Sequence, residues 1–324
     1  MQHIRLGDLT VSRIGLGCMG MSHLYTGHSR DEASSIRTIH HALDLGVTHI
    51  DTAELYGPFT NEELVGRALR GRRDEVVLAS KFGLMSHVGN PGPVDSSAAS
   101  IRLALEGSLR RLQTDHIDLY YQHRVDPAVP IEDVIGTLVE LIDEGKIRHI
   151  GLSEAGRETI RRAHSVHPIA ALQSEYSLWS RDADDGTIDL LAELGIGFVP
   201  YSPLNRGLLT GALRSRDELH ETDWRLTNPR FLPGALEANL EVVDELAAIG
   251  EEVGATPAQL ALAWLLALSP TWSPIPGTTR IDHLEEDLGA LDVALSPEQV
   301  QRLTDITPAV GGHHTEAQTR LFDR

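Results

Sequence analysis

Four polar side chains in this sequence are of the types needed to give a proton to an oxygen that gains negative charge. Asp51 and Tyr56 lie in the stretch Asp-Thr-Ala-Glu-Leu-Tyr-Gly, Lys81 closes the apolar run Val-Val-Leu-Ala-Ser, and His123 follows Leu-Tyr-Tyr-Gln. A free tyrosine has a pKa of about 10, and a nearby lysine cation favours the phenolate. We therefore expect Lys81 to lower the pKa of Tyr56, Asp51 to hold Lys81, and His123 to orient a substrate oxygen. Carbonyl reduction by hydride transfer is one reaction that such a centre suits.

The elements that must position these side chains are eight short apolar runs, each followed by a helical pattern. The runs are apolar throughout, which is typical of parallel strands buried on both faces. Eight such units predict an α/β fold, a (β/α)8 TIM barrel, with an N-terminal hairpin over residues 3–13 and two extra helices. The predicted strands are 14–18, 47–53, 76–81, 117–122, 147–153, 170–174, 197–201 and 272–275. The predicted helices are 31–45, 60–71, 98–112, 131–143, 156–165, 184–194, 236–252 and those opening at Thr256 and Ser296.

A doubly wound open sheet is the competing fold. The glycines of Gly15-Leu-Gly-Cys-Met-Gly20 precede a polar loop rather than a helix, which disfavours that alternative. No linker divides the chain, so we expect a single barrel domain over residues 1–324. Residues 204–235 show little of the hydrophobic periodicity of a helix or a strand, so we expect a packed functional loop there. The polar end, 307–324, is predicted to be either a mobile tail or a cover for the substrate pocket.

Composition narrows the class of protein. The 324 residues carry 28 basic and 47 acidic side chains, a formal net charge of -19, which argues against nucleic-acid binding. A single cysteine fits a reducing compartment. The N-terminus lacks a signal pattern, and no uncharged apolar run approaches the length of a membrane span. We therefore expect a cytoplasmic protein without a membrane partner, and the oligomeric state stays open.

An active site is indicated by several polar side chains being predicted at neighbouring strand ends, rather than by any one residue. In a barrel of this kind the active site lies at the carboxyl ends of the strands, where Asp51, Lys81 and His123 are all predicted to fall. Taken singly, each has an ordinary explanation. Asp51 could cap a turn, Lys81 could be a surface lysine, and Tyr56 could pack in the turn before Pro58. Together they favour a catalytic site.

These residues resemble the catalytic tetrad of the aldo-keto reductases, and the supporting motifs extend over about residues 3–306. The branch of bacterial and plant aldehyde or ketone reductases is the most similar. The motifs are Gly-Leu-Gly at 15–17, Asp-Thr-Ala-x-x-Tyr-Gly at 51–57, Gly-Leu-Ser at 151–153, Gln173, Tyr-Ser-Pro-Leu at 201–204 and Ile-Pro-Gly-Thr at 275–278. Glu154 and Asp287 stand where many members have asparagine, and Cys18 where many have threonine.

The resemblance implies NADPH-dependent reduction of aldehydes or ketones, with Tyr56 as proton donor. It implies that Tyr201 stacks on the nicotinamide and that Ser153 and Gln173 hydrogen-bond its carboxamide. It places the pyrophosphate along the loop after strand seven, and the adenosine end after strand eight. The cofactor-binding residues implied are Gly17, Met19, Asp51, Ser153, Gln173, Tyr201, Ser202, Leu204, Arg206, Gly207, Gly277, Thr278, Thr279, Arg280, Glu286 and Asp287.

Two other functions stay open. The first is a regulatory protein that binds the cofactor as a sensor, like the potassium-channel beta subunits of the same family. The second is a barrel aldolase that uses Lys81 as a Schiff-base nucleophile, although Asp51 would favour the charged lysine. The histidine pairs, including His313-His314, lack a credible set of three or four ligands, so we expect no metal site. We expect the pocket walls to come from loops near residues 21–25, Phe82, Trp224 and the tail, which offer aromatic and apolar surface and no obvious cluster of cations. The predicted substrates are therefore neutral aromatic or medium-sized carbonyl compounds.

Overall fold

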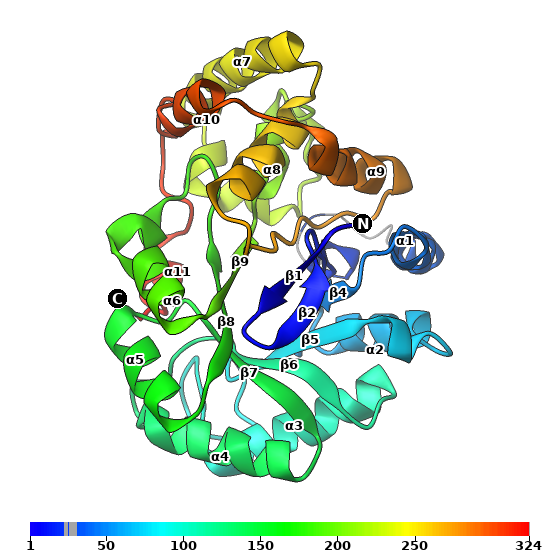
Figure 1. The fold of residues 1–324 in the computed structure, drawn as a ribbon, viewed down its shortest axis with the longest axis vertical. Coiled ribbons are helices and arrows are strands. Elements are labelled where there is room, and N and C mark those ends of the chain that lie inside the picture. Colours follow the sequence, from blue (N-terminus) through cyan, green and yellow to red (C-terminus); the bar gives the residue numbers. More distant parts are fainter. Residues whose placement is uncertain (23–24, 26–30, 324) are drawn as a thin grey trace.

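The computed structural model describes residues 1–22, 25 and 31–323, and at its centre is a ring of parallel strands surrounded by helices (Figure 1). Strands β1 (His3–Leu6) and β2 (Leu9–Ser12) form the antiparallel hairpin that the sequence predicts. This hairpin lies at the amino end of the barrel, because Gly7 contacts Ala170 and Leu6 contacts Gly197, at the beginnings of two barrel strands.

Seven parallel strands form one sheet in which each strand pairs with the next in the chain. Their inward side chains, such as Ala79, Leu119 and Val199, pack with the hairpin residues Leu6 and Val11 inside the barrel. The strands are β3 (Leu16–Gly17), β4 (His49–Asp51), β5 (Val77–Phe82), β6 (Ile117–Gln122), β7 (Ile147–Ser153), β8 (Ile169–Glu175) and β9 (Gly197–Tyr201). The fold is the predicted (β/α)8 barrel.

Residues 272–277 take the place of the eighth strand and close the ring. Ser273 and Ile275 donate backbone hydrogen bonds to β9, while the carbonyls of Pro274 and Pro276 accept from Gly15 and Gly17. The two prolines have no N–H to return to β3, so the segment makes single bridges rather than a full ladder. We call this junction between 272–277 and residues 14–17 the seam.

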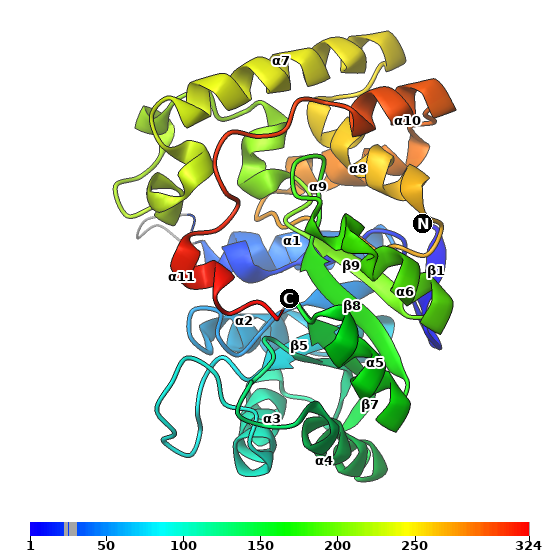
Figure 2. The same ribbon diagram turned by 90° about the vertical axis from the view of Figure 1, so that its left-hand side faces the viewer.

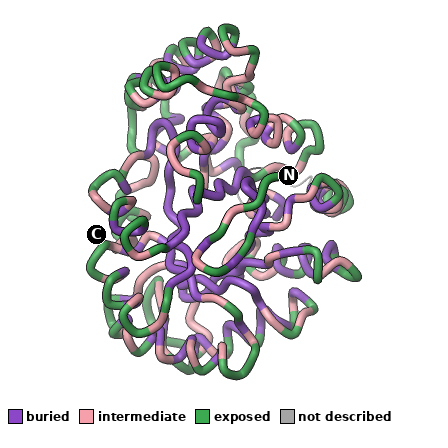
Figure 3. The backbone as a smooth tube through the Cα atoms, viewed as in Figure 1, coloured by how far each residue is buried: buried purple, intermediate pink, exposed green. Residues whose placement is uncertain are grey.

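A ring of helices covers the outer face of the sheet, and most of the apolar core lies between strands and helices (Figure 3). The two extra helices, α7 and α10, lie together at one side of the barrel (Figure 2). None of the described helices has both the length and the apolar character needed to cross a bilayer. The helices are α1 (Glu32–Asp44), α2 (Thr60–Ala68), α3 (Ala98–Leu112), α4 (Ile131–Asp143), α5 (Arg157–Val166), α6 (Thr187–Leu194), α7 (Ala235–Val253), α8 (Pro257–Leu268), α9 (Ile281–Gly289), α10 (Pro297–Thr304) and α11 (Glu316–Thr319).

Three details differ from the sequence prediction. The strand predicted at 14–18 is only two residues long, because its partner across the seam contains prolines. The loop after β9, predicted as irregular over 204–235, contains short 3-10 turns at Asn205–Thr210, Arg216–Glu218, Trp224–Thr227 and Pro229–Phe231. The short helix α11, near the C-terminus, was not predicted.

Candidate active site

The four residues of the predicted proton-donating centre lie together at the carboxyl ends of β4, β5 and β6. Lys81 Nζ is 2.5 Å from Asp51 Oδ1 and 3.1 Å from the hydroxyl oxygen of Tyr56. A third bond, of 2.8 Å, joins Lys81 to the carbonyl oxygen of Thr52. The ring centroids of Tyr56 and His123 are 6.0 Å apart. The tyrosine hydroxyl and the imidazole therefore face one space, with the lysine buried behind them.

The expected lowering of the Tyr56 pKa is opposed by burial. Burial raises the pKa of Tyr56 above its ordinary value, and the Lys81 cation counteracts this only in part. Lys81 does act to lower the pKa of Tyr56, as predicted, but the net shift is upward. Burial destabilises the phenolate by removing its hydration, and one nearby cation does not fully compensate for that loss. Tyr56 consequently keeps its proton at neutral pH, as a proton donor must.

Lys81 and His123 are held in different charge states. Burial disfavours the Lys81 cation, but Asp51 and Tyr56 outweigh that effect and raise the lysine pKa above its ordinary value. Burial, with Arg124 and Lys81, holds the pKa of His123 well below its usual range. The centre thus contains a charged lysine and a neutral imidazole, so that the histidine can donate one N–H without carrying charge.

A single cavity of about 780 Å³ opens beside this centre. Asp51, Tyr56 and His123 form part of its wall, and every residue that the resemblance implied for the cofactor also lines it. The cavity runs from the seam, at Gly17 and Gly277, along the loop after β9. An added Cβ at Gly17 would lie 2.9 Å from the carbonyl oxygen of Ile275, which explains glycine at this position.

The residues expected at the nicotinamide end lie around Asp51. Gln173 Nε2 donates to Asp51 Oδ2 at 2.8 Å, so this amide also fixes the carboxylate that holds Lys81. Ser153 Oγ is 3.2 Å from Arg124 Nη1. Glu154 has a positive φ of 52° and accepts the backbone N–H of Glu175, so its carboxylate is engaged with β8.

The end of the cavity at which the adenosine is expected is formed by residues 277–280 and helix α9. Arg280 caps the start of α9 and pairs with Asp282, on the exposed surface. A phosphate at this point would have to share the guanidinium with Asp282. Asp287 faces the same cavity but is only 4% exposed. Burial, together with the negative charge of Glu286, raises the pKa of Asp287 to about 8.

Sequence reasoning missed several residues of this cavity. Arg124, directly after His123, lines it as a cation that was not predicted. Trp224 and Tyr25, by contrast, were predicted as part of the pocket wall; both line the cavity and contact each other, with ring centroids 6.3 Å apart. Met21 and Phe82, predicted with them, are buried in the apolar core instead. The neighbouring positions 23–24, predicted to form part of the pocket wall with Met21, lie outside the described residues. The adjacency of Arg124 to His123 was the one available signal.

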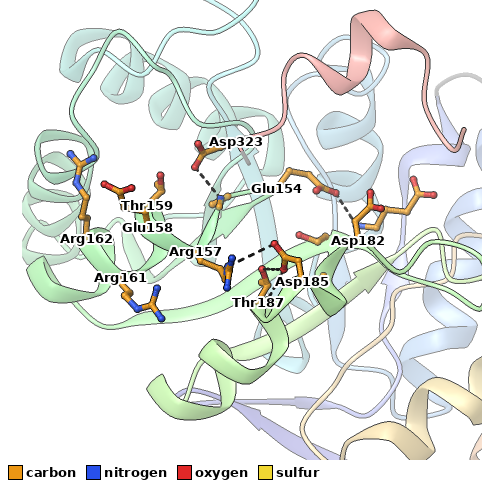
Figure 4. A pocket seen from close by; sticks show the side chains of 15 residues that line it. Glu154, Arg157, Glu158, Thr159, Arg161, Arg162, Asp182, Asp185, Thr187 and Asp323 are labelled. Atoms are coloured by element: carbon orange, nitrogen blue, oxygen red, sulfur yellow. Dashed lines mark hydrogen bonds and ion pairs between the residues drawn. The ribbon is translucent and has the colours of Figure 1, made fainter.

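The C-terminal segment also enters the site. Phe322 packs over the guanidinium of Arg124, at 4.9 Å, and lines the cavity with His314. Asp323 lies beside Glu154 in a second cavity of about 720 Å³, whose wall carries charges of both signs (Figure 4). Within the described part of the chain, Glu175, His313 and His314 offer ligand atoms within 4.8 Å of one another, a grouping that the sequence did not predict.

Comparisons with known proteins agree with this geometry. The family model described as "Aldo/keto reductase family" matches residues 13–308. A glycerol dehydrogenase from Gluconobacter oxydans is 31% identical, with a TM-score of 0.84 and 94% of each chain covered. A thermostable aldo-keto reductase bound to the inhibitor epalrestat is 30% identical, with a TM-score of 0.77 and coverage of 95% of this chain and 100% of that one. An aldo/keto reductase from Klebsiella pneumoniae, in complex with NADP and acetate, is 30% identical, with a TM-score of 0.74 and 95% of each chain covered.

Proposed function

The chain belongs to the aldo/keto reductase family, and from this premise we propose that it reduces neutral aldehydes or ketones to alcohols with NADPH. As a member of this family, the protein is an NAD(P)-dependent oxidoreductase that acts on carbonyl or alcohol groups. The observation that carries the proposed chemistry is the chain of contacts from Asp51 through Lys81 to the hydroxyl of Tyr56. The proposed cytoplasmic location is supported by the single cysteine.

Each residue of the centre has a distinct part in the proposed step. When bound, the cofactor supplies the hydride that adds to the carbonyl carbon. Tyr56, which burial keeps protonated, gives its proton to the oxygen as that oxygen gains charge. Lys81 stabilises the phenolate that remains, and Asp51 keeps Lys81 charged and in place. His123, held neutral, donates an N–H that orients the carbonyl oxygen.

The donor groups of the cavity fit a nicotinamide dinucleotide that carries an extra phosphate. Arg280, Thr278 and Thr279 stand at the start of α9, where free backbone N–H groups favour an anion. An arginine offers a planar fork of donors to phosphate oxygens. Asp282 competes for that fork in the absence of the cofactor. We therefore propose NADPH over NADH, with Arg280 released from Asp282 to bind the 2′-phosphate.

The substrate space favours a neutral, partly apolar carbonyl compound. Leu55, Leu84, Leu321 and Phe322 line this part of the cavity. Arg124 adds one cation, but it already donates to the carbonyl oxygen of His123 and lies against the ring of Phe322. A carboxylate substrate would have to displace these contacts, so we keep neutral carbonyl compounds as the proposed class.

The two alternatives have weaker support. An aldolase needs a neutral lysine as nucleophile, whereas Asp51 and Tyr56 raise the pKa of Lys81 above its ordinary value. A cofactor sensor does not need a proton donor beside an open substrate space. Borohydride trapping with a keto substrate would detect the first, and binding of NADPH without turnover would indicate the second.

A substrate panel tests the proposal directly. The protein is mixed with NADPH or NADH and with benzaldehydes, sugars or keto acids, and the absorbance of the reduced cofactor is followed. We expect sustained turnover, the highest kcat/KM for neutral aromatic aldehydes, and a preference for NADPH. A clear preference for keto acids would refute the substrate class, and absence of turnover with every carbonyl compound would refute the reductase activity.

A further inference from the structure

One buried carboxylate joins three segments that are far apart in the sequence. Glu175 ends β8, and its side chain is 1% exposed. Arg206, from the loop after β9, donates to both of its oxygens at 3.1 and 2.7 Å. His313 Nδ1 lies 3.3 Å from one oxygen and His314 Nε2 lies 3.0 Å from the other. Glu175 therefore links a barrel strand, the loop after β9 and the C-terminal segment 310–323.

Arg206 belongs to a turn with strained backbone. Asn205 and Arg206 have positive φ values of 52° and 59°, and Gly207 follows at 88°. Left-handed conformations at residues other than glycine cost on the order of 1–3 kcal/mol and persist only where the surroundings fix them. The ion pair with Glu175 holds both ends of the Arg206 guanidinium, whose side chain is 3% exposed, and the ring of Trp224 lies 5.2 Å from it. Arg225 donates to the carbonyl oxygen of Arg206 at 3.1 Å. The shape of this turn, which the family resemblance implies to follow the pyrophosphate, thus depends in part on Glu175.

The C-terminal segment is tied to the same loop through its backbone. Asn228 Nδ2 donates to the carbonyl oxygen of His313 at 3.0 Å, and Arg230 Nε donates to that of Gly311 at 3.2 Å. His314 Nε2 also lies 3.4 Å from the hydroxyl of Tyr201, the residue expected beneath the nicotinamide. The segment therefore contacts the loop after β9 both directly and through Glu175.

The far end of the segment is anchored at a different place. Asp323 Oδ2 accepts the backbone N–H of Gly156, at the start of α5, with a distance of 2.9 Å. The backbone N–H of Asp323 donates to the carbonyl oxygen of Glu154 at 3.1 Å. Figure 4 shows Asp323 beside Glu154 in the second cavity. Anchors at both ends hold residues 313–323 across the cavity mouth.

A metal ion is a poorer account of the Glu175–histidine cluster. Glu175, His313 and His314 have suitable ligand atoms, but Arg206 already occupies both carboxylate oxygens. The Arg206 guanidinium also lies 3.4 Å from His314 Nε2. A divalent cation would have to displace or closely approach this buried positive charge, which costs electrostatic energy.

We propose that Glu175, His313 and His314 are positioning residues for the cofactor loop, so that docking of segment 310–323 and binding of NADPH stabilise each other. This inference depends on the proposed cofactor role of the loop. The histidines hold Glu175, Glu175 holds Arg206, and Arg206 maintains the turn that receives the phosphates. Linkage requires the effect to be reciprocal, so bound NADPH strengthens docking of the segment by the same factor.

The first test measures NADPH affinity by fluorescence titration. The double variant His313→Ala/His314→Ala should raise the Kd about fivefold or more, within the usual range of coupling between sites. Arg320→Ala is the matched control, because Arg320 is an exposed residue of the same segment and should leave the Kd unchanged. Glu175→Gln should weaken binding further. The triple variant should match Glu175→Gln, because the histidines act through that carboxylate.

A second test covers the case in which Glu175→Gln fails to fold. Hydrogen exchange of amides in 310–323 is measured in the wild type and in the double histidine variant, with and without NADPH. NADPH should slow exchange in the wild type and much less in the variant. Equal Kd values for wild type and double variant, or no slowing in the wild type, would overturn this inference. A wild type that does not bind NADPH at all would instead refute the proposed function.

Discussion

Replacing Asp287 with asparagine should stabilise the fold at neutral pH. The Asp287 side chain lies on α9 in the wall of the cavity, is almost fully buried, and has the carboxylate of Glu286 beside it. Burial and this negative neighbour raise the pKa of Asp287 from 3.8 to about 8. Between these two values the folded protein binds a proton that the unfolded chain releases. The contribution of Asp287 to stability is therefore fully present below about pH 4 and is lost as the pH rises to about 8.

The size of this destabilisation follows from the interval between the unfolded-state and folded-state pKa values of Asp287. Each pH unit between the two pKa values is equivalent to about 1.4 kcal/mol, so the penalty reaches about 4 kcal/mol at pH 7. Relaxation and water entry reduce such penalties in proteins, so we expect Asp287→Asn to gain about 2–4 kcal/mol at pH 7. The asparagine cannot ionise, so the gain should shrink to near zero at pH 4.

Urea unfolding without cofactor, from pH 4.5 to 8, measures this difference. Asp282→Asn is the control, because the exposed Asp282 carboxylate pairs with Arg280 and its pKa is lowered to about 2. The Asp282 carboxylate is ionised in both the folded and the unfolded chain throughout this pH range. The free energy of unfolding of Asp282→Asn should therefore differ from that of the wild type by an amount that does not vary with pH. The reasoning fails if the difference between Asp287→Asn and the wild type is equally independent of pH.

Three further predictions concern the proposed site and its support. Tyr56→Phe should reduce kcat by about 10²–10⁴-fold without changing the Kd for NADPH, and adding Lys81→Met should cost little more; near-normal turnover would exclude Tyr56 as proton donor. Arg280→Ala should weaken NADPH binding by about 1.5–3 kcal/mol and leave NADH unchanged, whereas equal losses would place Arg280 away from the 2′-phosphate. Gly151→Ala should lower stability by about 1–3 kcal/mol, because the new Cβ would lie 2.3 Å from the ring of Tyr121; an unchanged Tm would argue against that packing.

The sequence predicted the barrel because its eight units carry local signals. Apolar runs, capping residues such as Thr256 and Ser296, and turn glycines all repeat with the expected period, and both of these caps are present. The strand predicted at 14–18 was too long, because its shortening depends on Pro274 and Pro276 across the seam. A contact of that kind is not visible in a local pattern.

The residues assigned to the site were placed together, but their energetics were not predictable from residue types. The net pKa of Tyr56 depends on how deeply the hydroxyl is buried, which no spacing encodes. In the sequence, Glu175 is an ordinary acidic residue directly after the predicted strand 170–174, until the fold brings Arg206 and His314 to it. Convergence of side chains from distant segments is a property of tertiary packing, so only the structure reveals the cluster.

The seam has a consequence for the order of folding. It joins the two ends of the barrel sequence, as in the hydrogen bond from the backbone N–H of Gly15 to the carbonyl oxygen of Pro274. Contacts of such large sequence separation have a high loop-closure entropy, and this one lacks the full ladder that stabilises the other strand pairs. We expect the seam to close last and to open first. Because Gly17 and Gly277 line the cavity that we propose for the cofactor, a bound dinucleotide would hold the seam closed and slow unfolding.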